Sequence, residues 1–284
     1  MSVSTKPDWA PALAAAQAHA LSTGALAPLS VEGETIVDGG LPFRVEWISS
    51  LAMKDLEGLP RAGDKAKAFN PFLPYERDLW VADISDTHVA ILNKFPVWSG
   101  HLLLITRAFV DQETPLDIAD ADALAQALTA MDGFLFYNSG GVAGASQAHR
   151  HLQMLPGYRP AIDTLASGDV ASGAPALPFA HVLRRLDRTA FENGRANGAE
   201  LAGLIADACR CAGIVSVDDR MPPYNLLITR DWLIVVPRRR ETVGGLSLSA
   251  LSYAGQIGLR TPDQIGLVRE MGPIRMMCEA AGRA

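Results

Sequence analysis

Residues 144–156 read GASQAHRHLQMLP, and His149, His151 and Gln153 stand at every second position of this stretch. On a helix His151 would point away from the other two side chains. On a strand all three project to one side, about 6.6 Å apart. Glycines precede the stretch and Pro156 ends it, which favours a short strand. The alternate positions are mostly apolar, so one face would pack in a core and the other would carry polar groups.

This polar row suits chemistry at phosphorus. A neutral imidazole is a nucleophile near pH 7, because its ordinary pKa is about 6.5. Attack would form a phosphoramidate, and the second ring nitrogen would need a fixed acceptor to set the tautomer. The loop before the polar row offers backbone N–H groups and one hydroxyl as hydrogen-bond donors to an anion, from Gly140, Gly141, Gly144 and Ser146. They can approach an anion closely because the glycines carry no side chain. Candidate counter-charges for a polyphosphate are Lys54, Lys94 and Arg150.

Other readings of the histidine pair stay open on the residues alone. Two imidazoles on one strand face are also typical zinc ligands, and His88 or His101 could complete such a set. With zinc, the chain could be a hydrolase or oxygenase. A separate alternative, which needs no zinc, is a nucleotide-binding sensor with little turnover. His101 is better explained as a structural hydrogen-bonding group. The chain has neither GxxxxGK[ST] nor GxGxxG, which excludes a P-loop and a dinucleotide-binding Rossmann turn.

Composition indicates an ordinary globular protein. The chain has 284 residues, 49% of them hydrophobic, and a formal charge of −6. Because nucleic-acid binders usually carry a basic face, this balance argues against such partners. Cys209, Cys211 and Cys278 form no CxxC pair, so we expect reduced, mostly buried thiols. No apolar run reaches eighteen residues, so we expect a cytoplasmic protein that does not enter a membrane.

The pattern of apolar residues and breakers predicts an α+β protein with an antiparallel sheet and helices packed on one side. Predicted strands are a hairpin within 34–49, then LWVADI, HVAILNKF, GHLLLIT, the histidine stretch, AHVLRRL, YNLLIT and WLIVVP. Predicted helices cover 9–22, 117 to about 137, about 199–212 and a segment from Thr261. The late strands either extend the first sheet or form a separate unit.

Three blocks carry a resemblance to a known family. YNSGGVAGASQAHRHLQMLP resembles the active-site segment of the histidine-triad superfamily in its H-x-H-x-Q form. Together with NPFLPYERDLWVADISDTHVAILNKFPVWSGHLLLIT and MPPYNLLITRDWLIVVPRR, it is similar to the diadenosine tetraphosphate phosphorylases, or ATP adenylyltransferases. The likeness runs from about residue 36 to 260. It implies a histidine-triad-like portion over 1–165 and an ATP adenylyltransferase C-terminal portion over 166–284 that closes the nucleotide site.

The resemblance implies a role for each matching position. His151 would be the nucleophile that accepts the adenylyl group, with His149 supporting the site and Gln153 binding phosphoryl oxygens. Further nucleotide contacts are implied for Asn93 at the ribose, for the α-phosphate loop of Asn138, Gly144 and Ser146, and for Lys54 at the phosphates. Lys94 and Asn225 are additional candidates for lining the nucleotide pocket.

The implied reaction is reversible phosphorolysis of diadenosine tetraphosphate (Ap4A) with inorganic phosphate, which gives ATP and ADP through a covalent histidine-AMP intermediate. Gln153 favours transfer, because an amide cannot supply a proton and a nucleotide polyphosphate leaves without one. A histidine-triad hydrolase of dinucleoside polyphosphates is the alternative within the superfamily. We expect no required cofactor and no metal ligand set, with Mg²⁺ serving only as a counter-ion of the polyphosphate.

Overall fold

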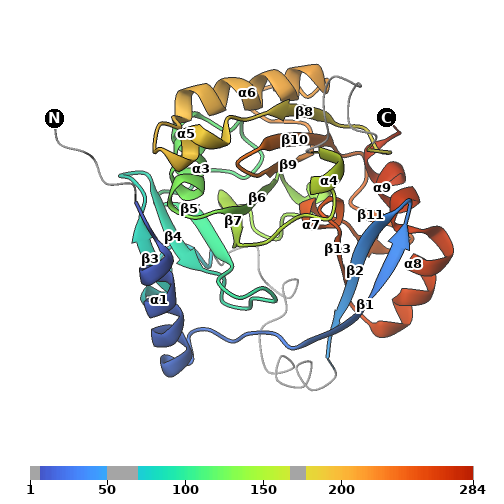
Figure 1. Ribbon diagram of the computed structural model, residues 1–284, viewed down its shortest axis with the longest axis horizontal. Helices are drawn as coiled ribbons and strands as arrows, with labels where there is room; N and C mark the ends of the chain where they lie inside the picture. The colour runs from blue at the N-terminus through green and yellow to red at the C-terminus, as the bar shows by residue number, and fades with distance from the viewer. Residues whose placement is uncertain (1–6, 50–69, 167–176, 284) are drawn as a thin grey trace.

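The computed structural model describes residues 7–49, 70–166 and 177–283 (Figure 1). Its centre is an eight-stranded sheet in which every neighbouring pair is antiparallel, as predicted. In spatial order the strands are β3 (Trp80–Asp83), β4 (His88–Leu92), β5 (Leu102–Thr106), β7 (His151–Pro156), β6 (Gly133–Asn138), β9 (Tyr224–Ile228), β10 (Trp232–Pro237) and β8 (Val182–Arg185).

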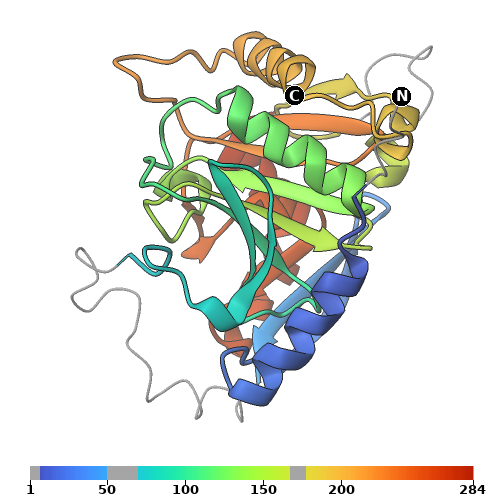
Figure 2. The same cartoon turned by 90° about the vertical axis from the view of Figure 1, so that its left-hand side faces the viewer.

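Helices cover one face of this sheet (Figure 2). Alternate side chains of the central strands, such as Leu152 and Met154, pack there against apolar residues of the two main helices. The helices on this side are α3 (Ile118–Ala130), α6 (Gly198–Cys211), α5 (Arg188–Glu192) and, at the β3 edge, α1 (Ala10–Thr23) with the short η1 (Arg77–Leu79). This helical layer packs against the apolar side chains of β7, on the face opposite the histidine side chains.

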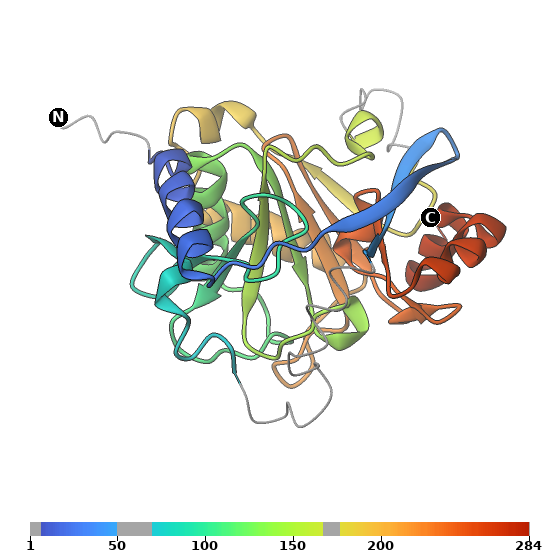
Figure 3. The ribbon, with the colours of Figure 1, turned by 90° about the horizontal axis from the view of Figure 1, so that it is seen from below.

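The opposite face packs against a second, smaller sheet and the C-terminal helices. Phe134, Phe136 and Leu155 point to this side. The covering elements are β1 (Val31–Asp38), β2 (Leu41–Ile48) and β13 (Gln256–Leu259), with α7 (Ala250–Tyr253), α8 (Ile265–Met271) and α9 (Pro273–Ala281). Figure 3 shows these C-terminal helices on the side of the molecule away from α1. Helices thus lie on both faces, whereas we predicted one.

The strands after residue 166 that we left unassigned, β8, β9 and β10, extend the large sheet and do not form a separate one. β6 pairs with β9, and β13 pairs in parallel with β2. A boundary at 165/166 therefore separates strands that hydrogen-bond within one sheet, and the division into two portions stays a prediction. The remaining short elements are η2 (Gly141–Ala143), α4 (Asp163–Ala166), β11 (Thr242–Val243), β12 (Leu246–Ser247) and η4 (Pro262–Gln264).

The helix predicted from Asp117 to about residue 137 is wrong in its second half. Its start is confirmed, since the Asp117 side chain accepts from the Asp120 N–H at 2.8 Å in a capping box. The chain leaves the helix at Met131 and runs as β6 from Gly133. All six β6 residues are buried, so the segment is apolar on both faces. A continuous apolar run fits a helical and an extended period equally well.

Two smaller expectations also need correction. The final helix is two helices, α8 and α9, because Gly272 breaks the chain between them at φ 79°. The cysteines are unpaired, but only Cys209 is buried. Among the described helices, none has both the length and the hydropathy that crossing a bilayer requires.

Candidate active site

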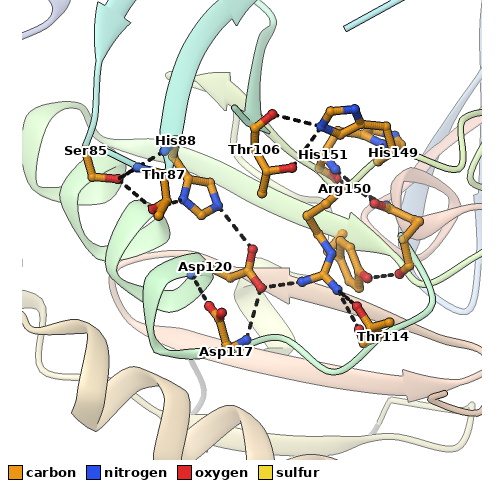
Figure 4. Close-up of polar contacts among 12 residues, drawn as sticks. Ser85, Thr87, His88, Thr106, Thr114, Asp117, Asp120, His149, Arg150 and His151 are labelled. Atoms are coloured by element: carbon orange, nitrogen blue, oxygen red, sulfur yellow. Dashed lines mark hydrogen bonds and ion pairs between the residues drawn. The ribbon is translucent and has the colours of Figure 1, made fainter. Parts of the chain in front are cut away.

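The polar row lies where β7 begins, in the middle of the large sheet. His151 and Gln153 pair with Ile105 and Leu103 of β5 and project to the face opposite Leu152. This confirms the predicted strand and its alternation. His149 precedes the strand and forms an isolated antiparallel bridge with Asp111. Figure 4 shows the rings of His149 and His151 close to each other.

Both nitrogens of the His149 ring are occupied by protein groups. Asn70 Oδ1 accepts from the Phe72 N–H, so its Nδ2 group donates to His149 Nδ1 at 2.8 Å. Nε2 of His149 lies 2.8 Å from both the carbonyl oxygen and the hydroxyl of Thr106, which assigns the proton to Nε2 (Figure 4). Neither nitrogen keeps a lone pair for a metal. His149 is therefore unsuited to be one of the two histidine ligands on which the zinc interpretation was based.

His151 has the complementary tautomer. Its Nδ1–H donates to the backbone carbonyl of His149 at 2.8 Å, which leaves the lone pair on Nε2. No described residue hydrogen-bonds to that nitrogen. The side chain is 4% exposed and lies beside the Phe72 ring. Burial lowers the pKa of His151 to about 4, so the ring is neutral at pH 7.

Gln153 is oriented by a short chain of hydrogen bonds. Asn93 donates from Nδ2 to His101 Nδ1 at 3.1 Å, because Asn93 Oδ1 accepts from the Phe95 N–H. His101 then donates from Nε2 to Gln153 Oε1 at 3.0 Å. Fixing the amide oxygen in this way leaves the amide N–H groups of Gln153 to face outward as donors. His101 is thus the structural hydrogen-bonding group that we expected.

The glycine loop sits at the end of β6, next to this row. Gly140 and Gly144 have φ of 77° and 96°, a region that favours glycine. A Cβ at Gly144 would lie 2.9 Å from Ser249 Cβ. Asn138 Oδ1 accepts from Asn225 Nδ2 at 2.8 Å and from the Ala250 N–H at 3.0 Å, so its own Nδ2 group is turned away as a donor. Ser146 is exposed on the loop.

Asn225 lies beneath the loop. It is fully buried, and its Nδ2 donates to both Asn138 Oδ1 and the Ala143 carbonyl at 2.8 Å. Its Oδ1 accepts from Arg238 at 2.7 Å. The whole amide is therefore engaged by protein groups. This geometry supports an indirect part for Asn225 through Asn138, while the predicted contact with nucleotide stays untested.

The candidate cations have different surroundings. Lys94 is half-exposed and pairs with Glu76 at 2.7 Å. Arg150, which we expected as a counter-charge, is wholly buried and points the other way, toward Asp120 and Thr114 (Figure 4). The expectation for Arg150 is wrong, because position 150 alternates with 149 and 151 and its side chain takes the opposite face. Lys54 lies outside the described residues.

Sequence reasoning missed a residue that holds the backbone of His151. The side chain of Gln112 lies between β6 and β7 beyond their last pair, Phe136 with Gln153. Its Oε1 accepts from the His151 N–H at 2.9 Å, and its Nε2 donates to the Asn138 carbonyl at 2.8 Å. Gln112 thus replaces ladder hydrogen bonds where the strands diverge. No local pattern marks it, since it stands 39 positions from His151.

Within the described parts of the chain, no cluster of three or more histidine, cysteine or acidic side chains could hold a metal ion. His88, the other proposed zinc ligand, bonds to Asp120 at 3.1 Å on the helix-covered face (Figure 4). The groups brought together at the start of β7 are a neutral imidazole with a free lone pair, a glycine loop, and two side-chain amides whose N–H groups have no acceptor among the described residues. This set suits binding and transfer of a phosphoryl-type group.

Comparisons with known proteins define the class. Residues 3–164 match the family model for the Ap4A phosphorylase N-terminal domain, and residues 175–282 match the ATP adenylyltransferase C-terminal domain. The chain belongs to this family of nucleotidyltransferases.

Particular relatives come from the yeast Saccharomyces cerevisiae. Diadenosine 5',5'''-P1,P4-tetraphosphate phosphorylase 2 is 24% identical over 255 residues, covering 77% of each chain. Protein APA1 is 25% identical over 264 residues, covering 81% of this chain and 79% of APA1. The crystal structure of yeast Ap4A phosphorylase Apa2 has a TM-score of 0.78 at 22% identity, over 98% of this chain and 95% of Apa2. Apa2 in complex with Ap4A has a TM-score of 0.77 at 21% identity and covers 98% of both chains.

Proposed function

We propose that this enzyme catalyses the reversible phosphorolysis of Ap4A to ATP and ADP through a covalent adenylyl group on His151. Membership of the Ap4A phosphorylase family supports the substrate class. The observation that carries the mechanism is the state of the His151 ring. It is neutral, its Nδ1–H is held by the His149 carbonyl, and Nε2 keeps its lone pair.

In the first step Nε2 of His151 attacks the phosphorus that carries one adenosine. A nitrogen–phosphorus bond forms, the bond between that phosphorus and the bridging oxygen breaks, and the bridging oxygen leaves as the terminal phosphate oxygen of ATP. The ring becomes cationic, and the hydrogen bond from Nδ1–H to the His149 carbonyl stabilises this charge. We assign the binding of the phosphoryl oxygens to the side-chain N–H groups of Gln153 and Asn138, which is supported by the engagement of both amide oxygens with protein donors.

In the second step an oxygen of inorganic phosphate attacks the same phosphorus, the nitrogen–phosphorus bond breaks, and ADP forms. Neither step needs a proton donor for the leaving group, because a polyphosphate and a neutral imidazole are both stable leaving groups at pH 7. An amide at position 153 fits this requirement. Mg²⁺ would act as a counter-ion on the polyphosphate, outside any protein ligand set. The cytoplasmic setting that we expect from the composition fits such small-molecule substrates.

Replacing the nucleophile tests the mechanism. His151→Ala should abolish phosphorolysis while keeping nucleotide affinity within about an order of magnitude, since most binding contacts stay. Radiolabelled AMP should become attached to the wild-type protein in an acid-labile form and not to the variant. His88→Ala is the matched control, because it removes a buried histidine from the other face and should leave labelling intact. Normal turnover by His151→Ala would disprove the covalent route.

Product separation distinguishes transfer from hydrolysis. Incubation with Ap4A should give ATP and ADP only when inorganic phosphate is present. Two molecules of ADP, or ATP with AMP, formed without phosphate would identify a dinucleoside polyphosphate hydrolase instead.

A further inference from the structure

Three arginines are buried in the described part of the chain, and one of them differs from the others in its electrostatic partners. Arg150 pairs with Asp120, and Arg230 lies 3.9 Å from Asp132. Arg238 is 4% exposed and takes part in no ion pair among the described residues. Arg238 opens the run Arg238-Arg239-Arg240, and it is buried while the other two arginines are exposed.

The Arg238 guanidinium hydrogen-bonds only to neutral acceptors, and the charge of the Glu241 carboxylate acts on it without forming an ion pair among the described residues. Nη1 donates to the Ala143 carbonyl at 3.1 Å and to Asn225 Oδ1 at 2.7 Å, while Nη2 donates to the Arg240 carbonyl at 2.8 Å. Nε is buried and has no partner in the described structure. The guanidinium carbon lies 5.6 Å from the centre of the Tyr253 ring. Burial lowers the pKa of Arg238, although the group stays protonated.

A buried cation that is not paired with a carboxylate in hydrogen-bond contact is costly, and an anion bound nearby lowers that cost. The carbonyl of Ala143 belongs to the glycine loop, so Arg238 supports that loop from its buried side. On the same side Asn225 donates to the side-chain oxygen of Asn138, a residue of the candidate site. The structure thus joins a buried positive charge that has no hydrogen-bonded carboxylate directly to the proposed phosphate loop.

We propose that Arg238 is a positioning residue whose charge, only partly balanced by Glu241, is balanced further by the phosphate group of the bound nucleotide. It orients the Ala143 carbonyl and, through Asn225, the Asn138 amide, and its charge makes the site select nucleotides over uncharged nucleosides. The inference rests on the proposed function, because it assumes that the glycine loop binds phosphate. It assigns part of the phosphate selectivity to a side chain that need not touch the substrate.

Equilibrium binding of adenosine, AMP and ATP, measured by calorimetry, tests this role without turnover. For Arg238→Gln we expect affinity for AMP and ATP to fall by about tenfold or more, because a desolvated charge acts strongly at short range. Affinity for adenosine should stay within about twofold of wild type by the same argument, since a neutral ligand lacks the charge. A purely structural role would weaken all three ligands alike, and that result would overturn the proposal.

Arg230→Gln is the matched control, because Arg230 is equally buried but bonds to the Leu128 carbonyl at the end of α3. It should lower stability and leave the ratio of AMP to adenosine affinity unchanged. If Arg238→Gln does not fold, Arg238→Lys decides the matter. It keeps the charge, so the wild-type ratio should persist within about threefold, and its loss would refute the charge role.

Failure of the proposed function would look different. In that case the wild-type protein would form no ATP and ADP from Ap4A and phosphate, whatever the binding ratios of the Arg238 variants.

Discussion

His151 shows how one neighbour sets the chemistry of a side chain. Its Nδ1–H is bound to the carbonyl two residues earlier, a contact that the extended backbone at 149–151 provides. Burial keeps the ring neutral without help from an acidic residue. The tautomer and the protonation state, which a nucleophile requires, therefore follow from backbone conformation and packing.

The same burial makes stability depend on pH. Burial lowers the pKa of both His101 and His151 to about 4, against about 6.5 when unfolded. The unfolded chain thus binds more protons between these values, so stability is complete above pH 6.5 and is lost as pH falls toward 4. Each histidine contributes on the order of 3 kcal/mol to this loss. Urea unfolding from pH 7 to pH 4 should show a steep decrease.

A variant isolates one of the two contributions. His101→Asn removes one buried imidazole, so its free energy of unfolding should decrease less steeply with falling pH than that of the wild type. An unchanged slope would show that His101 keeps an ordinary pKa in the folded state.

The sequence was enough to predict the polar row of His149, His151 and Gln153 and the strand that carries it. It was not enough to predict the residues that orient these side chains. Alternation places His151 and Gln153 on one face, because the period of a strand is two. Alternation also puts Arg150 on the other face, a consequence that we overlooked when we treated every cation near the motif as a counter-charge. The residues that orient this row make contacts with positions far away in the sequence; they are Gln112, Asn70 and Arg238. A single sequence carries no signal for such contacts.

At the scale of elements, the glycine loop depends on a close approach to the segment before α7. Gly144→Ala would place a methyl group 2.9 Å from Ser249 Cβ and force an alanine to φ 96°. We expect the loop to shift and kcat/KM for Ap4A to fall by about tenfold or more, with a stability cost of about 1–3 kcal/mol. Steady-state kinetics and urea unfolding measure the two effects.

Gly141→Ala is the control within the same loop, since a Cβ there meets nothing within 4 Å and its φ is not positive. It should be nearly neutral. Equal effects of the two substitutions would show that the conformation of Gly144 has no special importance.

Beyond the last pair of β6 and β7, the side chain of Gln112 links the two strands, and this link can be tested. Gln112→Ala would leave the His151 N–H and the Asn138 carbonyl buried without partners. This should cost about 2–4 kcal/mol of stability and slow the attachment of labelled AMP, because the nucleophile is no longer held. Gln126→Ala on α3, whose amide bonds to the half-exposed Asp122, should cost less than about 0.5 kcal/mol. If Gln112→Ala is labelled with AMP as fast as the wild type, Gln112 does not position His151.

Across the whole molecule, the large sheet runs through both halves of the sequence. β6 has β7 on one side and β9 on the other, and both sheet faces are covered by packed residues. The Asn138, Asn225 and Arg238 contacts bind the C-terminal segment to the glycine loop. The site is therefore complete only when the two halves are folded together.

This topology predicts that the chain unfolds as one cooperative unit. Far-UV circular dichroism and the fluorescence of tryptophans such as buried Trp232 should give coincident urea transitions. A fragment of residues 1–165 should aggregate, because it would expose the β6 edge and the apolar faces that the C-terminal elements cover. Adding residues 166–284 as a separate chain should restore solubility and labelling. Two separate transitions, or a soluble and folded fragment alone, would instead establish two independent domains that meet at the sheet.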